Sequence, residues 1–152
     1  MRIAVFSDSH GEVEPMLRAV RDHAPDLILH LGDHARDAEE LQRELPAGDI
    51  RFVRGNCDWD SDAPDVLTPL AEGVRLFMTH GHRYSVKLTL ESLANAAHFA
   101  GAPLALFGHT HEPEYRVMGD VTVFNPGAAG PGGSFGLITV KGTGFQCEIK
   151  RL

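Results

Sequence analysis

Residues 2–33 read RIAVFSDSHGEVEPMLRAVRDHAPDLILHLGD and contain the repeating unit from which the fold can be inferred. Residues 2–7 begin with a short apolar run, which is typical of a buried strand. Apolar residues then recur at helical spacing, at Val13, Leu17, Val20 and Ala24. Residues 26–31 form a second apolar run. This strand–helix–strand order predicts parallel strands joined by a right-handed crossover.

The remaining chain continues this alternation and then changes character. The pattern predicts helices over 36–45 and about 86–100, and strands over 50–54, 66–70, 74–79 and 104–107. The last quarter predicts four strands joined by glycine-bearing turns, near 114–118, 121–125, 135–140 and 144–149. An α/β first half followed by antiparallel strands indicates an α/β fold of two packed sheets with helices outside. Because no linker or low-complexity segment interrupts the pattern, we expect residues 1–152 to form a single domain.

Composition narrows the class of protein. The 152 residues are 43% hydrophobic and 23% charged, as in soluble globular domains. The net charge of −7 and the lack of a lysine/arginine cluster make nucleic acid an unlikely partner. No apolar stretch is long enough for a signal peptide or a membrane span, and two cysteines do not indicate a disulfide framework, so we expect a cytoplasmic protein. A homo-oligomer is compatible with the sequence.

Residues that can bind a divalent metal ion follow five of the predicted strands. They are Asp8 and His10, Asp33, Asn56, His80, and the pair His109 and His111. Sites in open α/β sheets collect at the carboxyl ends of the strands, so these side chains are expected to meet. Each two-residue pair aims both side chains at one point if its segment stays extended.

The ligand types restrict the metal. Carboxylate, amide and imidazole ligands without thiolate suit manganese, iron(II), nickel, cobalt or zinc rather than calcium. Seven ligands exceed the needs of one tetrahedral zinc ion. They suit two divalent ions that share a carboxylate, with manganese favoured.

The five motifs resemble those of the calcineurin-like metallophosphoesterase superfamily, in particular its small, minimal phosphodiesterase branch. The superfamily pattern D-x-H, GD, GNxD, H and GHxH is present in order, and the resemblance extends from Asp8 to Gly127. It implies a four-layer αββα sandwich of two mixed β-sheets flanked by helices. It also implies that Asp8, His10 and His111 bind one ion, that Asn56, His80 and His109 bind the other, and that Asp33 bridges them.

The activity implied by this resemblance is hydrolysis of a small phosphoester, with a phosphodiester favoured over a monoester. The resemblance also implies attack on phosphorus, in line, by a water or hydroxide that the two ions activate. Asp33, Asn56 and His82 are the candidate catalytic residues, with His82 facing the substrate or supporting a ligand. Two positions depart from common patterns: Cys57 stands where larger relatives carry a histidine acid, and Ala128 stands where the branch usually has serine. The first departure places the leaving-group acid in question, and the second removes one polar phosphate contact.

Other interpretations compete with this one. A non-catalytic metal-binding or protein-interaction scaffold on the same fold is the alternative, although such relatives tend to lose metal-binding histidines and none is lost here. Asp58 is expected to order a turn, and Trp59 to line the pocket or to pack in the core or at the rim. The remaining histidines are expected at the surface or in packing positions, and they are His23, His30, His34 and His98.

Overall fold

Residues 1–152 are all described by the computed structural model, in which two β-sheets face each other. The first sheet has five strands in the order β11 (Gly144–Arg151), β10 (Ser134–Lys141), β1 (Arg2–Phe6), β2 (Leu27–His30) and β3 (Ile50–Phe52). Strands β1, β2 and β3 are parallel, as the strand–helix–strand pattern predicts. Strand β10 pairs antiparallel with β1, and β11 antiparallel with β10.

The second sheet has three parallel strands at its centre. They are β6 (Val74–Thr79), β7 (Leu104–Leu106) and β9 (Val121–Asn125). Antiparallel strands flank them, namely β4 (Val66–Leu67), β5 (Leu70–Ala71) and β8 (Glu114–Met118). Both sheets are therefore mixed.

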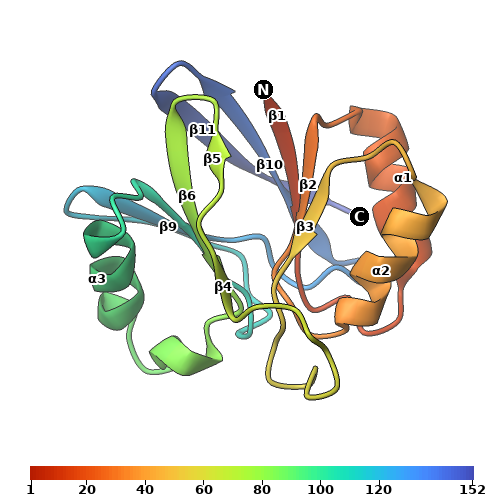
Figure 1. Cartoon of the computed structure of the whole chain (residues 1–152), viewed down its shortest axis with the longest axis horizontal. Helices are drawn as coiled ribbons and strands as arrows, with labels where there is room; N and C mark the ends of the chain where they lie inside the picture. Colours follow the sequence, from red (N-terminus) through yellow and green to blue (C-terminus); the bar gives the residue numbers. More distant parts are fainter.

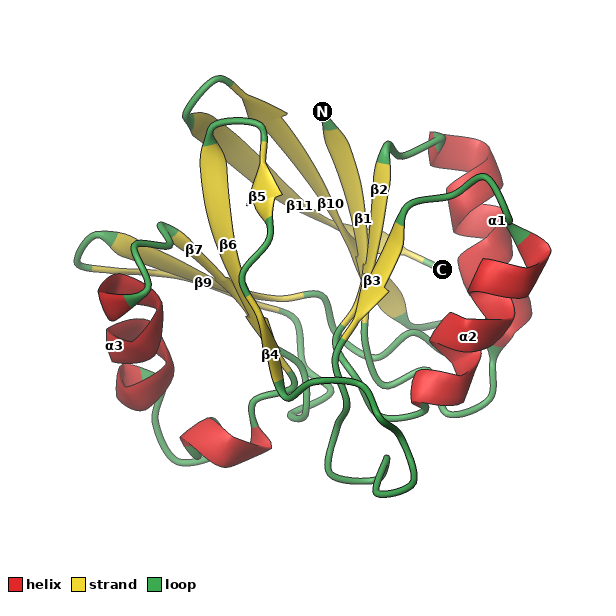
Figure 2. Cartoon of the chain, in the orientation of Figure 1, coloured by secondary structure: helices red, strands yellow, loops and turns green.

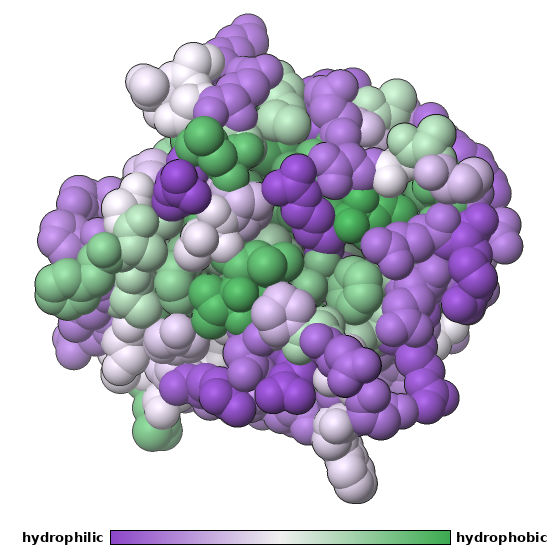
Figure 3. Space-filling view, in the orientation of Figure 1, coloured by the Kyte–Doolittle hydropathy of each residue, from purple (hydrophilic) through white to green (hydrophobic).

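Helices cover the outer face of each sheet (Figures 1 and 2). Helices α1 (Val13–His23) and α2 (Ala35–Glu44) lie against the first sheet, and α3 (Glu91–Phe99) lies against the second. The surface on the α1 and α2 side is mainly hydrophilic, because these helices turn their apolar residues toward the sheet (Figure 3). The result is the predicted four-layer αββα sandwich. None of the three helices is both long and apolar enough to cross a membrane.

The alternation of side chains along β1 links the layers. Ile3 and Val5 join the central core between the sheets, whereas Ala4 and Phe6 pack against the α1 and α2 layer. Leu76 and Leu106 of the second sheet belong to the same central core as Ile3 and Val5. All the residues of these clusters are buried, so the hydrophobic effect fixes the register of β1.

Two predicted elements differ most clearly from the sequence pattern. The predicted strand 66–70 is divided into β4 and β5 around Pro69, which has no N–H to donate to a sheet. The predicted helix 86–100 begins only at Glu91, because residues 85–88 form a turn after the short 3₁₀ helix η1 (His82–Tyr84). Ser85, at the start of this turn, has a φ of 53°.

Candidate metal centre

Six of the seven predicted ligands form two adjoining clusters. Asp8, His10, Asp33 and His111 form the first, and Asp33, His80 and His109 form the second. Within each cluster the candidate ligand atoms lie within 4.8 Å of one another. Asp33 belongs to both, so its carboxylate occupies the position that a bridging ligand requires.

The route by which these side chains converge differs from the predicted one. Asp8, His10, His109 and His111 all have positive φ values, between 50° and 69°, so neither pair continues an extended strand. In both segments the backbone turns sharply after the strand ends. Asp8 and His10 still share a cluster, but His109 and His111 divide between the two. The segments do not stay extended, as strand alternation requires, so left-handed turns place the ligands instead.

Hydrogen bonds hold Asp8 in a single orientation. Its Oδ2 accepts from Ser7 Oγ at 2.6 Å and from the His109 backbone N–H at 3.1 Å. Its Oδ1 is buried without a hydrogen-bond donor and lies 3.1 Å from Nε2 of His111. One oxygen therefore positions the group, while the other is directed into the first cluster.

His80 is oriented in a similar way. Its Nδ1 donates to the backbone carbonyl oxygen of Leu31 at 2.8 Å. Its Nε2 is buried, lacks a hydrogen-bond partner and lies 3.4 Å from Oδ2 of Asp33. Backbone contact at one ring nitrogen commonly fixes the other as a metal ligand.

The two unpartnered atoms test whether metal ions fit. A buried polar atom without a partner costs about 1–3 kcal/mol. Asp8 Oδ1 and His80 Nε2 both carry this cost, and both point into the clusters. Divalent cations would satisfy both atoms, so the donor set fits two ions.

The charges of the site are strongly coupled. Burial raises the pKa of Asp33, but the His80 ring and the Cys57 N–H outweigh burial and hold that pKa well below its usual range. Burial lowers the pKa of His80, but the carboxylates of Asp33 and Asp8 raise it overall. Burial first, then the neighbouring His80, lowers the pKa of both His82 and His109. Asp33 is therefore an anion, and His80 is the imidazole whose raised pKa favours the cationic form beside it.

Asp58 connects two of the ligand loops. Its Oδ2 accepts from the Gly55 N–H at 2.8 Å, and its Oδ1 accepts from the N–H groups of His34 and Ala35, each at 2.9 Å. The latter two groups open helix α2, where a carboxylate is favourable. The structural role expected of Asp58 is thus confirmed, and it locks the Asn56 loop against the Asp33 loop.

The sequence pattern predicts a surface or packing position for His30, whereas the structure places it in a buried polar network behind the first cluster. Gly32 N–H donates to Nδ1 of His30 at 3.2 Å, and Nε2 of the same ring contacts Ser9 Oγ at 2.8 Å. Ser9 in turn donates to Asp37 Oδ2 at 2.6 Å, which also accepts from Gly11 N–H at 2.7 Å. His30 therefore ties the loop after β1 to the loop after β2.

Because Nδ1 of His30 accepts a hydrogen bond, the ring is neutral, and burial lowers its pKa from 6.5 to about 4. The unfolded chain takes up a proton below about pH 6.5, whereas the folded chain does so only near pH 4. The contribution of His30 to stability is full above pH 6.5 and is lost as the pH falls. The wild-type protein should lose unfolding free energy as the pH falls from about 7.5 to about 5. We expect the His30→Gln variant to lose about 2 kcal/mol less over the same range.

This prediction is checked by urea unfolding of the metal-free protein at both pH values. His98→Gln is the matched control, because His98 is an exposed histidine paired with Asp120. An equal pH dependence of His30→Gln and wild type would contradict the proposed protonation state.

The last residue of β9 and the segment that follows it support the GHTH loop. Asn125 is fully buried, and its Nδ2 donates to Gly108 O and to Thr110 Oγ1, both at 3.0 Å. Its Oδ1 accepts from Gly127 N–H at 2.9 Å. The Asn-Pro-Gly segment thus holds the loop that carries His109 and His111, and Ala128 follows it as a partly buried residue.

The remaining candidate residues lie around the clusters. Asn56 is exposed, and its Nδ2 contacts Cys57 Sγ at 3.6 Å. The His82 ring lies 5.6 Å from the His80 ring and 6.2 Å from the His109 ring, with a buried Nδ1 that lacks a partner. Burial, followed by the Asp33 carboxylate, raises the pKa of the exposed Cys57 thiol. Cys147 packs against the central core, and both cysteines are free.

Comparisons with known proteins agree with this geometry. Residues 1–142 match the family model of the calcineurin-like phosphoesterase superfamily domain. The probable metallophosphoesterase YsnB of Bacillus subtilis is 34% identical over 131 residues, which cover 84% of this chain and 75% of the relative. The phosphodiesterase YfcE of Escherichia coli is 29% identical over 134 residues, covering 83% and 68%.

Structural similarity extends over the whole fold. A predicted phosphoesterase from Streptococcus pneumoniae superposes with a TM-score of 0.85 at 24% identity, covering 99% of this chain and 88% of that one. The chain belongs to the calcineurin-like phosphoesterase superfamily. The names of its relatives support a phosphoester hydrolase, and its Asp/His clusters supply a candidate metal-binding site.

Proposed function

We propose that this protein is a phosphodiesterase that depends on two divalent metal ions. The observation that carries the proposal is the pair of buried, unpartnered atoms, Asp8 Oδ1 and His80 Nε2, each directed into a cluster that contains Asp33. Phosphodiesters are preferred over monoesters because relatives such as YfcE bear the name phosphodiesterase.

Each cluster would hold one ion. Asp8, His10 and His111 would hold the first, His80 and His109 would hold the second with Asn56, and Asp33, which belongs to both clusters, would serve both. Manganese is the favoured metal, since carboxylate, amide and imidazole ligands without thiolate suit it. When bound, the ions supply Lewis acidity to the phosphate and lower the pKa of a water molecule.

The protein contributes positioning and charge. Ser7 and the His109 N–H hold Asp8, and the Leu31 carbonyl holds His80, so the ligands need little rearrangement to act. Asn56 is exposed and so is accessible to the substrate phosphate. The His82 ring stands beside the second cluster, where it can donate to or accept from the substrate.

A scaffold function on the same fold is the second candidate. It would not require Asp8 and His80 to be held by hydrogen bonds while each keeps one unpartnered atom. These metal-binding groups therefore favour a metal-dependent hydrolase over a scaffold that binds no metal.

We expect the purified protein, loaded with manganese, to hydrolyse bis(p-nitrophenyl) phosphate faster than p-nitrophenyl phosphate. A chelator should abolish both activities. Nickel, cobalt and zinc, tested in parallel, would rank the metals. An unchanged rate after complete removal of metal would exclude the proposed chemistry.

We also expect elemental analysis of the loaded protein to approach two ions per chain, as the two clusters sharing Asp33 imply. Replacing His109 by alanine should remove about one of them, because His109 belongs only to the second cluster. His98→Ala is the control, since His98 is exposed and pairs with Asp120. A stoichiometry of one that His109→Ala leaves unchanged would contradict the two-ion assignment.

A further inference from the structure

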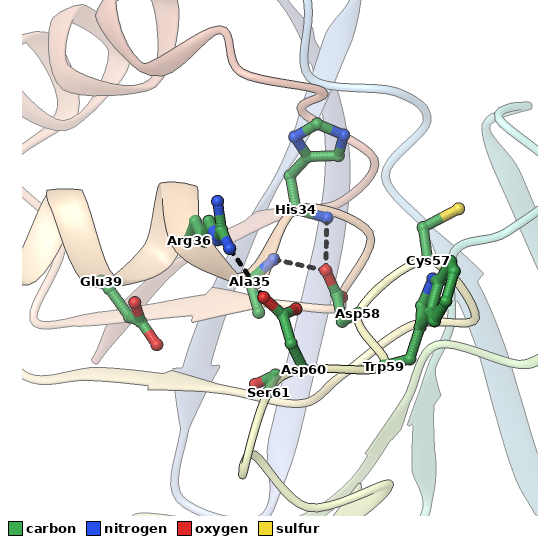
Figure 4. A pocket seen from close by; sticks show the side chains of 9 residues that line it. All are labelled: His34, Ala35, Arg36, Glu39, Cys57, Asp58, Trp59, Asp60 and Ser61. Atoms are coloured by element: carbon green, nitrogen blue, oxygen red, sulfur yellow. Dashed lines mark hydrogen bonds and ion pairs between the residues drawn. The ribbon is translucent and has the colours of Figure 1, made fainter.

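A pocket of about 660 Å³ opens between the start of helix α2 and the loop that follows β3. His34 and Arg36 line it from the helix side, and Cys57, Trp59 and Asp60 from the loop side (Figure 4). This loop projects beyond the edges of both sheets (Figure 1). None of the expected metal ligands lines the pocket, so it is a separate feature of the surface.

The pocket nevertheless adjoins the metal centre. The His34 ring lies 5.0 Å from the ring of His10, a member of the first cluster. The Cys57 N–H donates to Oδ1 of Asp33 at 3.0 Å. A phosphate held at the clusters would therefore have one of its ester arms next to the pocket.

Trp59 is the unusual residue of this pocket. It is the only tryptophan of the chain, and 89% of its surface is exposed. A large aromatic side chain gains no stability from such exposure, because it buries almost no apolar area. The position makes it available to stack against a flat group from outside.

The charges of the lining indicate which flat group fits. Three carboxylates face the pocket, at Glu39, Asp58 and Asp60, and the single cationic side chain is Arg36. Arg36 is already engaged with Asp60 at 2.6 Å. The pocket therefore disfavours a second phosphate or other anion, and its carboxylates can accept hydrogen bonds from amino groups.

We propose that this pocket binds the base of a nucleoside on one ester arm of the phosphodiester, with the base stacked on Trp59. An amino-bearing base combines the flat face that Trp59 needs with the donors that Glu39 and Asp60 accept. The kinetic test of this inference rests on the proposed hydrolase activity. The inference specifies nucleoside phosphodiesters as the substrate class of the proposed metal centre.

The test compares two diesters with the same leaving group. The p-nitrophenyl ester of AMP carries a nucleoside arm, and methyl p-nitrophenyl phosphate carries a methyl group instead. With manganese-loaded protein we expect Trp59→Ala to raise KM for the AMP ester by about 5- to 100-fold, the range for loss of base–aromatic stacking. KM for the methyl ester should change less than twofold, and Trp59→Phe should restore most of the loss.

Phe99→Ala is the matched control, because Phe99 is an aromatic residue with 87% exposure at the end of α3, outside this pocket. It should leave both substrates unaffected. An equal loss on both substrates in Trp59→Ala, or no loss on either, would overturn the proposal.

A second measurement is independent of hydrolysis. Because Trp59 is the only tryptophan, its fluorescence reports directly on the pocket. The methyl ester of AMP should quench it saturably in metal-free protein, whereas the methyl ester of ribose phosphate should not. If neither nitrophenyl ester were cleaved, the hydrolase assignment would fail. The fluorescence titration would then show by itself whether the pocket binds the base.

Discussion

Asp33→Asn should lower phosphodiesterase activity by about 10³-fold or more, since a divalent centre supplies several kcal/mol of transition-state stabilisation. Asp33 is the only residue common to both clusters, and its carboxylate is held as an anion. Asparagine keeps the shape of the side chain and can still accept the Cys57 N–H. It removes the negative charge that would hold two cations close together.

The expected defect is in metal binding rather than in folding. In metal-free protein, Asp33→Asn should unfold at a temperature close to that of wild type, while the rise in Tm on adding manganese should be much smaller. Asn56→Ala should be milder, because Asn56 is exposed and uncharged, and saturating manganese should recover most of its activity.

Asp120→Asn serves as the control, since Asp120 is an exposed carboxylate that pairs with His98. Near-normal turnover of Asp33→Asn at saturating manganese would show that Asp33 does not bridge two ions.

Much of the fold could be predicted from the sequence, because the apolar runs and their spacing follow directly from burial. Ile3 and Val5 face one layer and Phe6 the other, so β1 needed a wholly apolar run. Such a run between polar residues is recognisable without a structure. The break at Pro69 depends on a single backbone position, and the late start of α3 on the turn over residues 85–88, neither of which periodicity detects.

The identity of the site residues was easier to predict than their placement. The motif order indicated which side chains meet, and six of the seven do meet in two clusters. Their left-handed φ values could not be inferred, because non-glycine residues rarely adopt them outside constrained sites. His30 carried no sequence signal, since its partners Ser9 and Asp37 are brought together only by the fold.

The loops of Gly32 and Gly55 are in direct backbone contact beside Asp33. A Cβ on Gly32 would lie 2.5 Å from the Gly55 nitrogen. A Cβ on Gly55 would lie 2.5 Å from the Asp33 nitrogen and would collide with Oδ1 of Asp33. Two backbones in direct contact cannot give way as a flexible side chain can, so glycine is required at both positions.

Gly55→Ala should therefore displace the carboxylate of Asp33 and break its hydrogen bond from Cys57. A displacement of about 1 Å at a reacting centre can cost about 10²-fold in rate, and overpacking typically costs about 1–3 kcal/mol of stability. We expect both losses, measured as kcat on bis(p-nitrophenyl) phosphate and as the unfolding free energy in urea. Gly130→Ala is the matched control, because a Cβ there meets no atom within 4 Å. If Gly55→Ala kept wild-type activity and manganese content, the contact between these two loops could not be what positions Asp33.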